Sequence, residues 1–184
     1  MRFCSIASGS SGNCIYVGSD NTHVLVDIGI SGKKMETGLN SLELTGRDLD
    51  GILITHEHSD HIKGLGVISR KYGIPIYATA GTVDAMVRTN ALGKIPEGIF
   101  HEIQENEPFM INDLKVNPFT IPHDAALPVG YRLEHEGHSV GIATDLGKYN
   151  DYIIENLQGL DALLLEANHD IRMLQVGKYP YYLK

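Results

Sequence analysis

The stretch from Ile52 to His61 constrains the fold of this chain more than any other feature. Three apolar residues, Ile52 to Ile54, run directly into the sequence Thr-His-Glu-His-Ser-Asp-His. In an extended segment, residues two apart point the same way, so His56 and His58 share one face. Asp60 and His61 follow at once in a turn. Because imidazole and carboxylate are common ligands of Zn²⁺ and similar ions, the pattern predicts a buried strand whose end holds metal, rather than a polar loop with chance histidines.

The segment reads His-x-His-x-Asp-His and resembles the signature of the metallo-β-lactamase superfamily. Residues 24–29 are similar to the family's strand that ends in Asp-x-Gly, and residues 121–124 and 143–147 match its later motifs. The opening, residues 7–14, and the late stretch, residues 166–170, are similar to the bacterial YycJ/WalJ-like branch. That branch is a group of cytoplasmic metallohydrolases related to nucleases.

The resemblance implies a pair of divalent cations, with Zn²⁺ or Mn²⁺ expected. The first metal would be held by His56, His58 and His123, the second by Asp60 and His61, and both would be bridged by Asp145. Asp60 and Asp145 are the expected catalytic residues. Asp27 either orients a metal-binding histidine or only ends a strand before Gly29.

Several of these residues also have ordinary structural interpretations. Asp145 stands in a sequence typical of turns, and His123 follows a proline. Residues 8–13 fit a glycine-rich hairpin turn, with a place on the substrate side as the alternative. The other histidines have no motif around them and are expected on the surface or on edge strands: His23, His101, His135 and His138.

Composition and charge limit the classes of function. The net charge of −8 disfavours broad coating of nucleic acid, although bound cations dominate the local field of a nuclease site. No apolar run is long enough to span a membrane, and the N-terminus lacks the apolar core of a secretory signal, so a cytoplasmic protein without membrane contact is expected. Cys4 and Cys14 are interpreted as small buried apolar residues, without a disulfide or a structural zinc site.

Strand-like and helical patterns alternate along the chain, which predicts an α/β (α+β) protein. The resemblance specifies an αββα sandwich. Strands are expected at residues 2–7, 13–18, 23–27, 52–55, 76–77, 99–103, 114–121, 129–134, 139–144 and 162–167, and helices at 33–42, 62–72, 82–92 and 151–157.

The C-terminal part departs from the family pattern, which normally ends with one more histidine on a late strand. After Asp145 the chain offers only His169, and the roles of Asn168 and His169 are open. We therefore expect residues 1–184 to form a single domain that is incomplete at its C-terminus and lacks the last elements of the sandwich. The second metal site would be impaired, and apolar surface would be exposed around residues 163–165.

The function expected from the resemblance is metal-dependent hydrolysis, most simply by a phosphodiesterase or nuclease that uses a metal-bound hydroxide. A 5′-exonuclease activity on DNA or RNA is favoured, with nucleic acid as the substrate partner. A thioester or lactone hydrolase is the alternative, because the same ligands serve both reactions. A metal-binding scaffold without turnover is a second alternative. The native metal and the oligomeric state are not fixed by the sequence.

Overall fold

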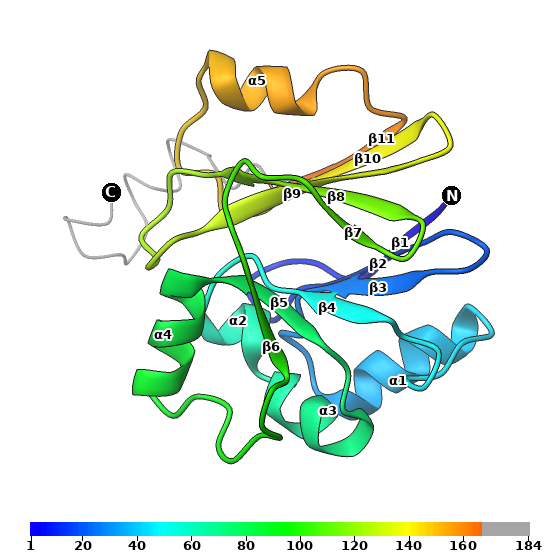
Figure 1. Cartoon of the computed structure of the whole chain (residues 1–184), viewed down its shortest axis with the longest axis vertical. Coiled ribbons are helices and arrows are strands. Elements are labelled where there is room, and N and C mark those ends of the chain that lie inside the picture. Colours follow the sequence, from blue (N-terminus) through cyan, green and yellow to red (C-terminus); the bar gives the residue numbers. More distant parts are fainter. Residues whose placement is uncertain (167–184) are drawn as a thin grey trace.

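Two β-sheets lie face to face, and helices cover the outer side of each (Figure 1). The computed structural model describes residues 1–166. The first sheet contains, in spatial order, β1 (Arg2–Ala7), β2 (Cys14–Gly18), β3 (His23–Val26), β4 (Gly51–Leu53), β5 (Ile76–Thr79) and β6 (Phe100–Ile103). The second contains β11 (Ala162–Leu165), β10 (His138–Ala143), β9 (Val129–His135), β8 (Leu114–Thr120) and β7 (Phe109–Ile111).

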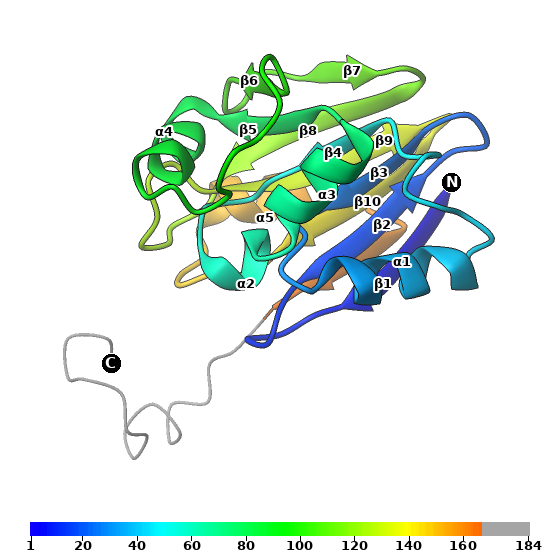
Figure 2. The ribbon, with the colours of Figure 1, turned by 90° about the horizontal axis from the view of Figure 1, so that it is seen from below.

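The helices complete a four-layer arrangement. The first sheet is covered by α1 (Gly32–Ser41), α2 (Ser59–Ile62), α3 (Leu65–Tyr72) and α4 (Ala80–Arg88), which lie in front of it in Figure 2. The outer side of the second sheet is covered by α5 (Asp151–Leu157). The αββα sandwich expected from the sequence is confirmed.

Strands of the first sheet are apolar on both faces because both faces are covered. In β3, Leu25 packs toward the helices, whereas Val24 and Val26 pack into the core between the sheets. The same alternation holds after the next crossover, where Ile52 faces the helices and Leu53 faces the second sheet. This two-sided burial explains why these strands read as continuous apolar runs.

Parallel pairing brings the motif-bearing ends of the strands to one edge. Strands β3, β4, β5 and β6 pair in parallel, so their carboxyl ends share an edge of the first sheet. In the second sheet, the segment that follows β8 reaches the same region, since Val129 donates its N–H to the carbonyl of Thr55 at 3.0 Å. The segment that follows β10 also reaches it, since Asp145 Oδ2 lies 2.8 Å from His61 Nε2. Loops from both sheets therefore meet beside the end of β4.

One expected helix is divided in two. Residues 62–72 were expected to be continuous, but α2 and α3 are separated at Gly64. The N–H of Gly64 donates to the carbonyl of Ile28 at 2.8 Å, and a Cβ here would lie 2.1 Å from the carbonyl of Ile30. The close approach of that loop is a tertiary constraint that helical periodicity does not contain. The expected end at Gly73 is confirmed, with φ at 67°.

Other differences lie at the ends and edges of elements. Helix α4 spans residues 80–88 instead of the expected 82–92, and its earlier start follows from the Thr79 side chain, which accepts from the N–H of Thr82 and caps the helix. Strand β7 was not predicted. Strand β11 lies at the end of its sheet among the described residues, and Leu163 and Leu165 are exposed by 41% and 49%, which agrees with the apolar surface expected there. Cys14 is buried as expected, whereas Cys4 is only partly buried. No helix among residues 1–166 is long and apolar enough to cross a membrane.

Candidate metal centre

Four imidazole rings meet where the loops converge, three from the segment that joins β4 to α2 and one from the loop after β8. His56 follows β4, His58 caps α2, His61 lies inside α2, and His123 follows β8. The ring centroids of His56 and His61 are 4.0 Å apart, and His56 lies 4.7 Å from both His58 and His123. Figure 1 places these strand ends beside one another, between the two sheets and next to α4.

The first group of possible ligands contains only nitrogen. One ring nitrogen from each of His56, His58 and His123 lies within 4.8 Å of the others. The closest pair, His58 Nδ1 and His123 Nε2, is 3.1 Å apart. Ligand atoms bound tetrahedrally to zinc at 2.0–2.1 Å are separated by about 3.3 Å, so the spacing suits a shared cation with small adjustments.

The second group places Asp145 between two imidazoles. Its Oδ2 lies 2.8 Å from His61 Nε2 and 3.7 Å from His56 Nε2. Because His56 also belongs to the first group, Asp145 stands where a bridging carboxylate would be required. Asp60 lies at the rim, with Oδ2 3.7 Å from His61 Nε2 and its side chain 31% exposed.

His56 carries a buried nitrogen that protein groups do not satisfy. Its Nε2 atom is inaccessible to solvent and has no hydrogen-bond partner among the described residues. Buried polar atoms almost always have partners, and an exception needs a physical explanation. A cation that accepts the lone pair of this nitrogen provides one, so the residues present fit the metal that the sequence predicts.

A buried carboxylate orients two of the rings. Asp27 is fully buried, and its Oδ2 lies 2.8 Å from His61 Nδ1. The backbone N–H of Thr55 donates to Asp27 Oδ1 at 2.9 Å, and the Thr55 hydroxyl donates to Oδ2 at 2.8 Å. The same hydroxyl oxygen lies 3.0 Å from His56 Nδ1. A ring that donates from Nδ1 presents the lone pair of Nε2 to the site. Asp27 therefore orients the ring of His61 by direct contact and the ring of His56 through the Thr55 hydroxyl.

Burial and charge set different protonation states for the two rings. Burial, with the nearby His61, His123 and His58 rings, lowers the pKa of His56 to about 2, which keeps it neutral. Burial also opposes charge on His61, but the carboxylates of Asp27 and Asp145 outweigh it and raise its pKa to about 10. The pKa of Asp145 is lowered because its contact with His61 outweighs its own burial.

Three backbone segments interlock beneath the site. Asn13 donates its backbone N–H to the carbonyl of Asp60 at 2.8 Å and accepts from the N–H of Gly29 at 2.7 Å. A Cβ on Gly29 would lie 1.6 Å from the Asp60 carbonyl oxygen, so only glycine fits there. Asp27 and Asp145 adopt φ of 61° and 54°, a strained backbone that is common where function fixes the geometry.

The structure brings together all six residues that the sequence singled out as metal ligands, with Asp60 the most peripheral. Two polar residues of this region were given no individual role from the sequence. They are Thr55, which stands immediately before His56, and Asn13, which ends the glycine-serine loop. That loop forms the β1–β2 hairpin turn and also lies against the site, so the two interpretations of residues 8–13 are compatible. Asn168 and His169 lie outside the described residues.

The four other histidines that the structure describes lie elsewhere, as expected. His101 and His138 are exposed, and His23 and His135 are partly buried at strand ends. None of the four belongs to either group of possible ligands among residues 1–166.

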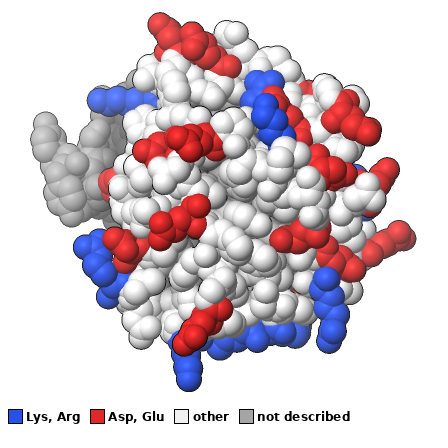
Figure 3. All heavy atoms as spheres, viewed as in Figure 1, with Lys and Arg blue, Asp and Glu red and all other residues white. Residues whose placement is uncertain are grey.

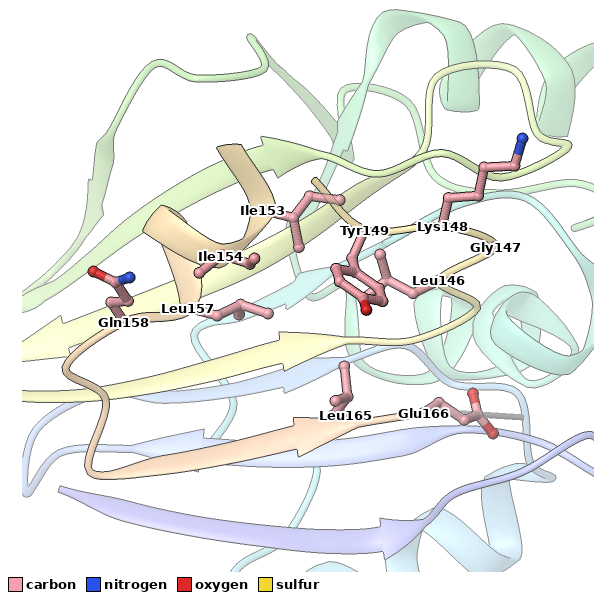
Figure 4. Close-up of a pocket in the computed structure, with 10 residues that line it drawn as sticks. All are labelled: Leu146, Gly147, Lys148, Tyr149, Ile153, Ile154, Leu157, Gln158, Leu165 and Glu166. Carbon is pink, nitrogen blue, oxygen red and sulfur yellow. The ribbon is translucent and has the colours of Figure 1, made fainter. Parts of the chain in front are cut away.

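An apolar pocket of about 770 Å³ is lined in part by residues 146–149, which directly follow Asp145 in the sequence (Figure 4). Its walls come from the loop after β10, from α5 and from the end of β11, and its lining residues include Leu146, Tyr149, Ile154, Leu157 and Leu165. Tyr149 is 80% exposed. The pocket therefore offers apolar and aromatic surface between α5 and the second sheet, and none of the six candidate ligands lines it.

Comparison with known families identifies one match over most of the chain. Residues 22–177 match the model of the Beta-lactamase superfamily domain. The matched region contains all six candidate ligands.

Two bacterial relatives match the whole chain in sequence. Exodeoxyribonuclease YycJ of Bacillus anthracis is 41% identical over 184 residues, which are 100% of this chain and 69% of the relative. Exodeoxyribonuclease WalJ of Streptococcus pneumoniae is 39% identical over 184 residues, which are 100% of this chain and 68% of the relative.

A solved structure supports the fold. Zn²⁺-bound PqqB from Methylobacterium extorquens superposes with a TM-score of 0.74 at 19% identity, covering 91% of this chain. This chain spans 64% of the length of that protein.

Proposed function

Because this chain belongs to the metallo-β-lactamase superfamily, in its YycJ/WalJ-like branch, we propose that it is a metal-dependent hydrolase that acts as an exodeoxyribonuclease. Two relatives that match its whole length, at 41% and 39% identity, carry that name. A 5′ polarity and a cytoplasmic location, both expected from the sequence, remain parts of this proposal.

One observation carries the proposal. Four imidazoles and the Asp145 carboxylate from five positions in the sequence converge, and the buried Nε2 of His56 lacks any protein partner within the described chain. Packing alone does not favour this arrangement, since buried unsatisfied nitrogen destabilises a fold by about 1–3 kcal/mol.

The residues have separate tasks in this proposal. Bound divalent cations would supply Lewis acidity and lower the pKa of water toward neutrality. His56, His58 and His123 would hold one cation, and Asp60 and His61 would hold the other. Asp145 lies between the two proposed cation positions, where its negative charge would offset part of the positive charge of the cations. Asp27, through Thr55, fixes which ring nitrogens face the site.

The donor atoms limit the choice of cation. All six candidate ligands offer nitrogen or oxygen, which suits Zn²⁺ and Mn²⁺. The first position has three imidazoles, whereas the second has one imidazole beside carboxylates, and its imidazole holds a proton at neutral pH. We therefore propose that the second position binds its cation more weakly.

The distribution of surface charge favours binding of one part of the substrate over binding along a whole duplex. In Figure 3 basic side chains gather mainly at the lower edge, and acidic side chains are spread over much of the remaining face. With a net charge of −8, long-range attraction of DNA is weak. This arrangement suits an enzyme that holds one phosphate of a chain end, rather than a protein that coats a duplex.

A second candidate function rests on the pocket whose lining begins at Leu146, the residue that follows Asp145. Its apolar lining suits an acyl chain, as a thioester or lactone hydrolase would require. The same metal-binding residues would serve that reaction.

A substrate panel separates these functions. The Mn²⁺- or Zn²⁺-loaded protein is incubated with end-labelled DNA, RNA, an acyl thioester and a lactone. The proposal predicts stepwise release of nucleotides from DNA, suppressed by a chelator. His58→Ala is expected to lower the rate at least about 100-fold, since it removes a ligand. His138→Ala, which changes an exposed histidine, is the control. Turnover of the thioester or lactone without DNA cleavage would reject the nuclease assignment, and no turnover with metal bound would support a scaffold.

A further inference from the structure

Glu57 stands between His56 and His58, yet neither group of possible ligands within the described part of the chain includes it. Its Oε1 instead accepts the backbone N–H of Ala126 at 2.9 Å. Ala126 comes three residues after His123. This hydrogen bond therefore joins the segment of two candidate ligands to the loop that carries the third.

The second oxygen of this carboxylate is buried without a partner. Glu57 Oε2 is inaccessible to solvent, and none of residues 1–166 forms a hydrogen bond to it. Removing a carboxylate oxygen from water without a partner costs free energy, and one backbone N–H on the other oxygen offsets only part of that cost. Stability of the fold therefore does not explain this side chain, whereas a role in placing the loop does.

The loop between β8 and β9, which carries His123, has little apolar anchoring. Residues 122–127 are all exposed or only partly buried. Hydrogen bonds therefore hold the loop more than packing does. One of them ties it to the start of α4, where the Thr79 hydroxyl donates to the carbonyl of Leu127 at 2.8 Å.

The bond from Glu57 differs from the other ties of this loop in where it begins. A third tie runs from the N–H of Gly147, in the loop after β10, to the carbonyl of Pro122 at 3.2 Å. Of the three ties, only that of Glu57 begins in the segment that also carries two ligands of the first group. It therefore acts most directly on the distance between those two rings and His123.

We propose that Glu57 is a positioning residue, whose carboxylate holds the loop so that the ring of His123 stays beside the ring of His58. These rings approach to 3.1 Å between His58 Nδ1 and His123 Nε2, a spacing that suits a shared cation. The inference deepens the proposed function and rests on cation binding by the first group of ligands. Glu57 itself contacts neither cation nor substrate.

Two substitutions separate the acceptor from the charge. Glu57→Ala removes the acceptor of the Ala126 N–H. Glu57→Gln keeps an oxygen that can accept this N–H and removes the negative charge. Glu107→Ala, in an exposed turn before β7, is the matched control.

The measurement is the Zn²⁺ affinity of the tighter position, by titration against a chromophoric chelator, with Tm recorded for every variant. We expect Glu57→Ala to weaken this affinity about 10–100-fold, as loss of groups that orient metal ligands does. Glu57→Gln and Glu107→Ala should match the wild type.

A double-variant cycle tests whether Glu57 acts through His123. In the His123→Ala background the ring to be positioned is absent, so Glu57→Ala should cause no further loss of affinity. A side chain that only stabilised the fold would weaken binding equally in both backgrounds.

Three results would overturn the inference: wild-type affinity in Glu57→Ala, equal losses in Glu57→Ala and Glu57→Gln, which would assign the effect to charge, or additive losses with His123→Ala. The proposed function fails separately. If the wild-type protein binds no Zn²⁺, both proposals are rejected. If it binds Zn²⁺ and Glu57→Gln retains the affinity that Glu57→Ala loses, but no nucleotides are released from DNA, the exonuclease proposal is rejected while the role of Glu57 stands.

Discussion

Asp27 is fully buried and contacts two of the candidate metal-binding histidines, one directly and one through a hydroxyl group. It contacts His61 Nδ1 directly and reaches His56 Nδ1 through the Thr55 hydroxyl. The sequence alone left its role open between orienting a ligand and ending a strand. The hydrogen bonds favour the first interpretation, and the positive φ of Asp27 accompanies it.

Substitution of this carboxylate should separate orientation from folding. Asp27→Asn is expected to lower cation affinity about 10–100-fold, because the amide presents one acceptor where the carboxylate presents two. Titration against a chromophoric chelator measures this, with Tm recorded in parallel. Asp50→Asn, at the opposite end of β4, is the matched control. Equal cation affinities for Asp27→Asn and the wild type would reject the orienting role.

The protonation of His61 predicts how metal binding depends on pH. Its raised pKa means that the ring is protonated at neutral pH, so a cation must displace that proton. Affinity at the second position should therefore rise about tenfold per pH unit between about pH 6 and 8. The first position should change less, because burial keeps His56 and His123 neutral. Calorimetry in buffers of different ionisation enthalpy measures the protons released. Release of no proton at the second position would contradict this assignment.

At the scale of elements, the sequence predicts strand cores better than their junctions. The end of β4 and its histidines follow from apolar patterning and the motif, and α5 has its expected bounds. The break at Gly64 and the placement of Asn13 and Thr55 depend on contacts between segments distant in the sequence. Local patterns do not contain those contacts, so the supporting residues of the site were missed although its candidate ligands were identified.

The backbones of Asn13, Gly29 and Asp60 are in close contact. We therefore predict that one methyl group added at Gly29 disrupts the site. Gly29→Ala should destabilise the fold by about 3 kcal/mol or more, since its Cβ would meet the Asp60 backbone and neither strand end can move freely. Gly73→Ala, at φ 67° with open space around it, should cost only about 1–2 kcal/mol. Urea unfolding and cation content distinguish them. Retention of wild-type cation affinity and stability by Gly29→Ala would show that the loops are not rigidly coupled.

At the scale of the molecule, the core between the two sheets joins early and late strands. Val24 and Val26 share this core with Val129 and Val140. The single domain expected over residues 1–184 stays a prediction. Exposed apolar surface was expected around residues 163–165, and Leu163 and Leu165 are exposed. The proposed cause, an incomplete C-terminus, remains a prediction, as does an impaired second metal position.

The central claim is that the imidazole cluster at the end of β4 holds a pair of divalent cations. Anomalous diffraction at the zinc edge, from crystals grown with Zn²⁺, tests it most directly. Two peaks are expected, about 3.5–4 Å apart. The stronger should lie among the ring nitrogens of His56, His58 and His123, and the weaker beside His61 and Asp145. Full occupancy at some other place on the protein, with no peak inside the cluster, would contradict the account.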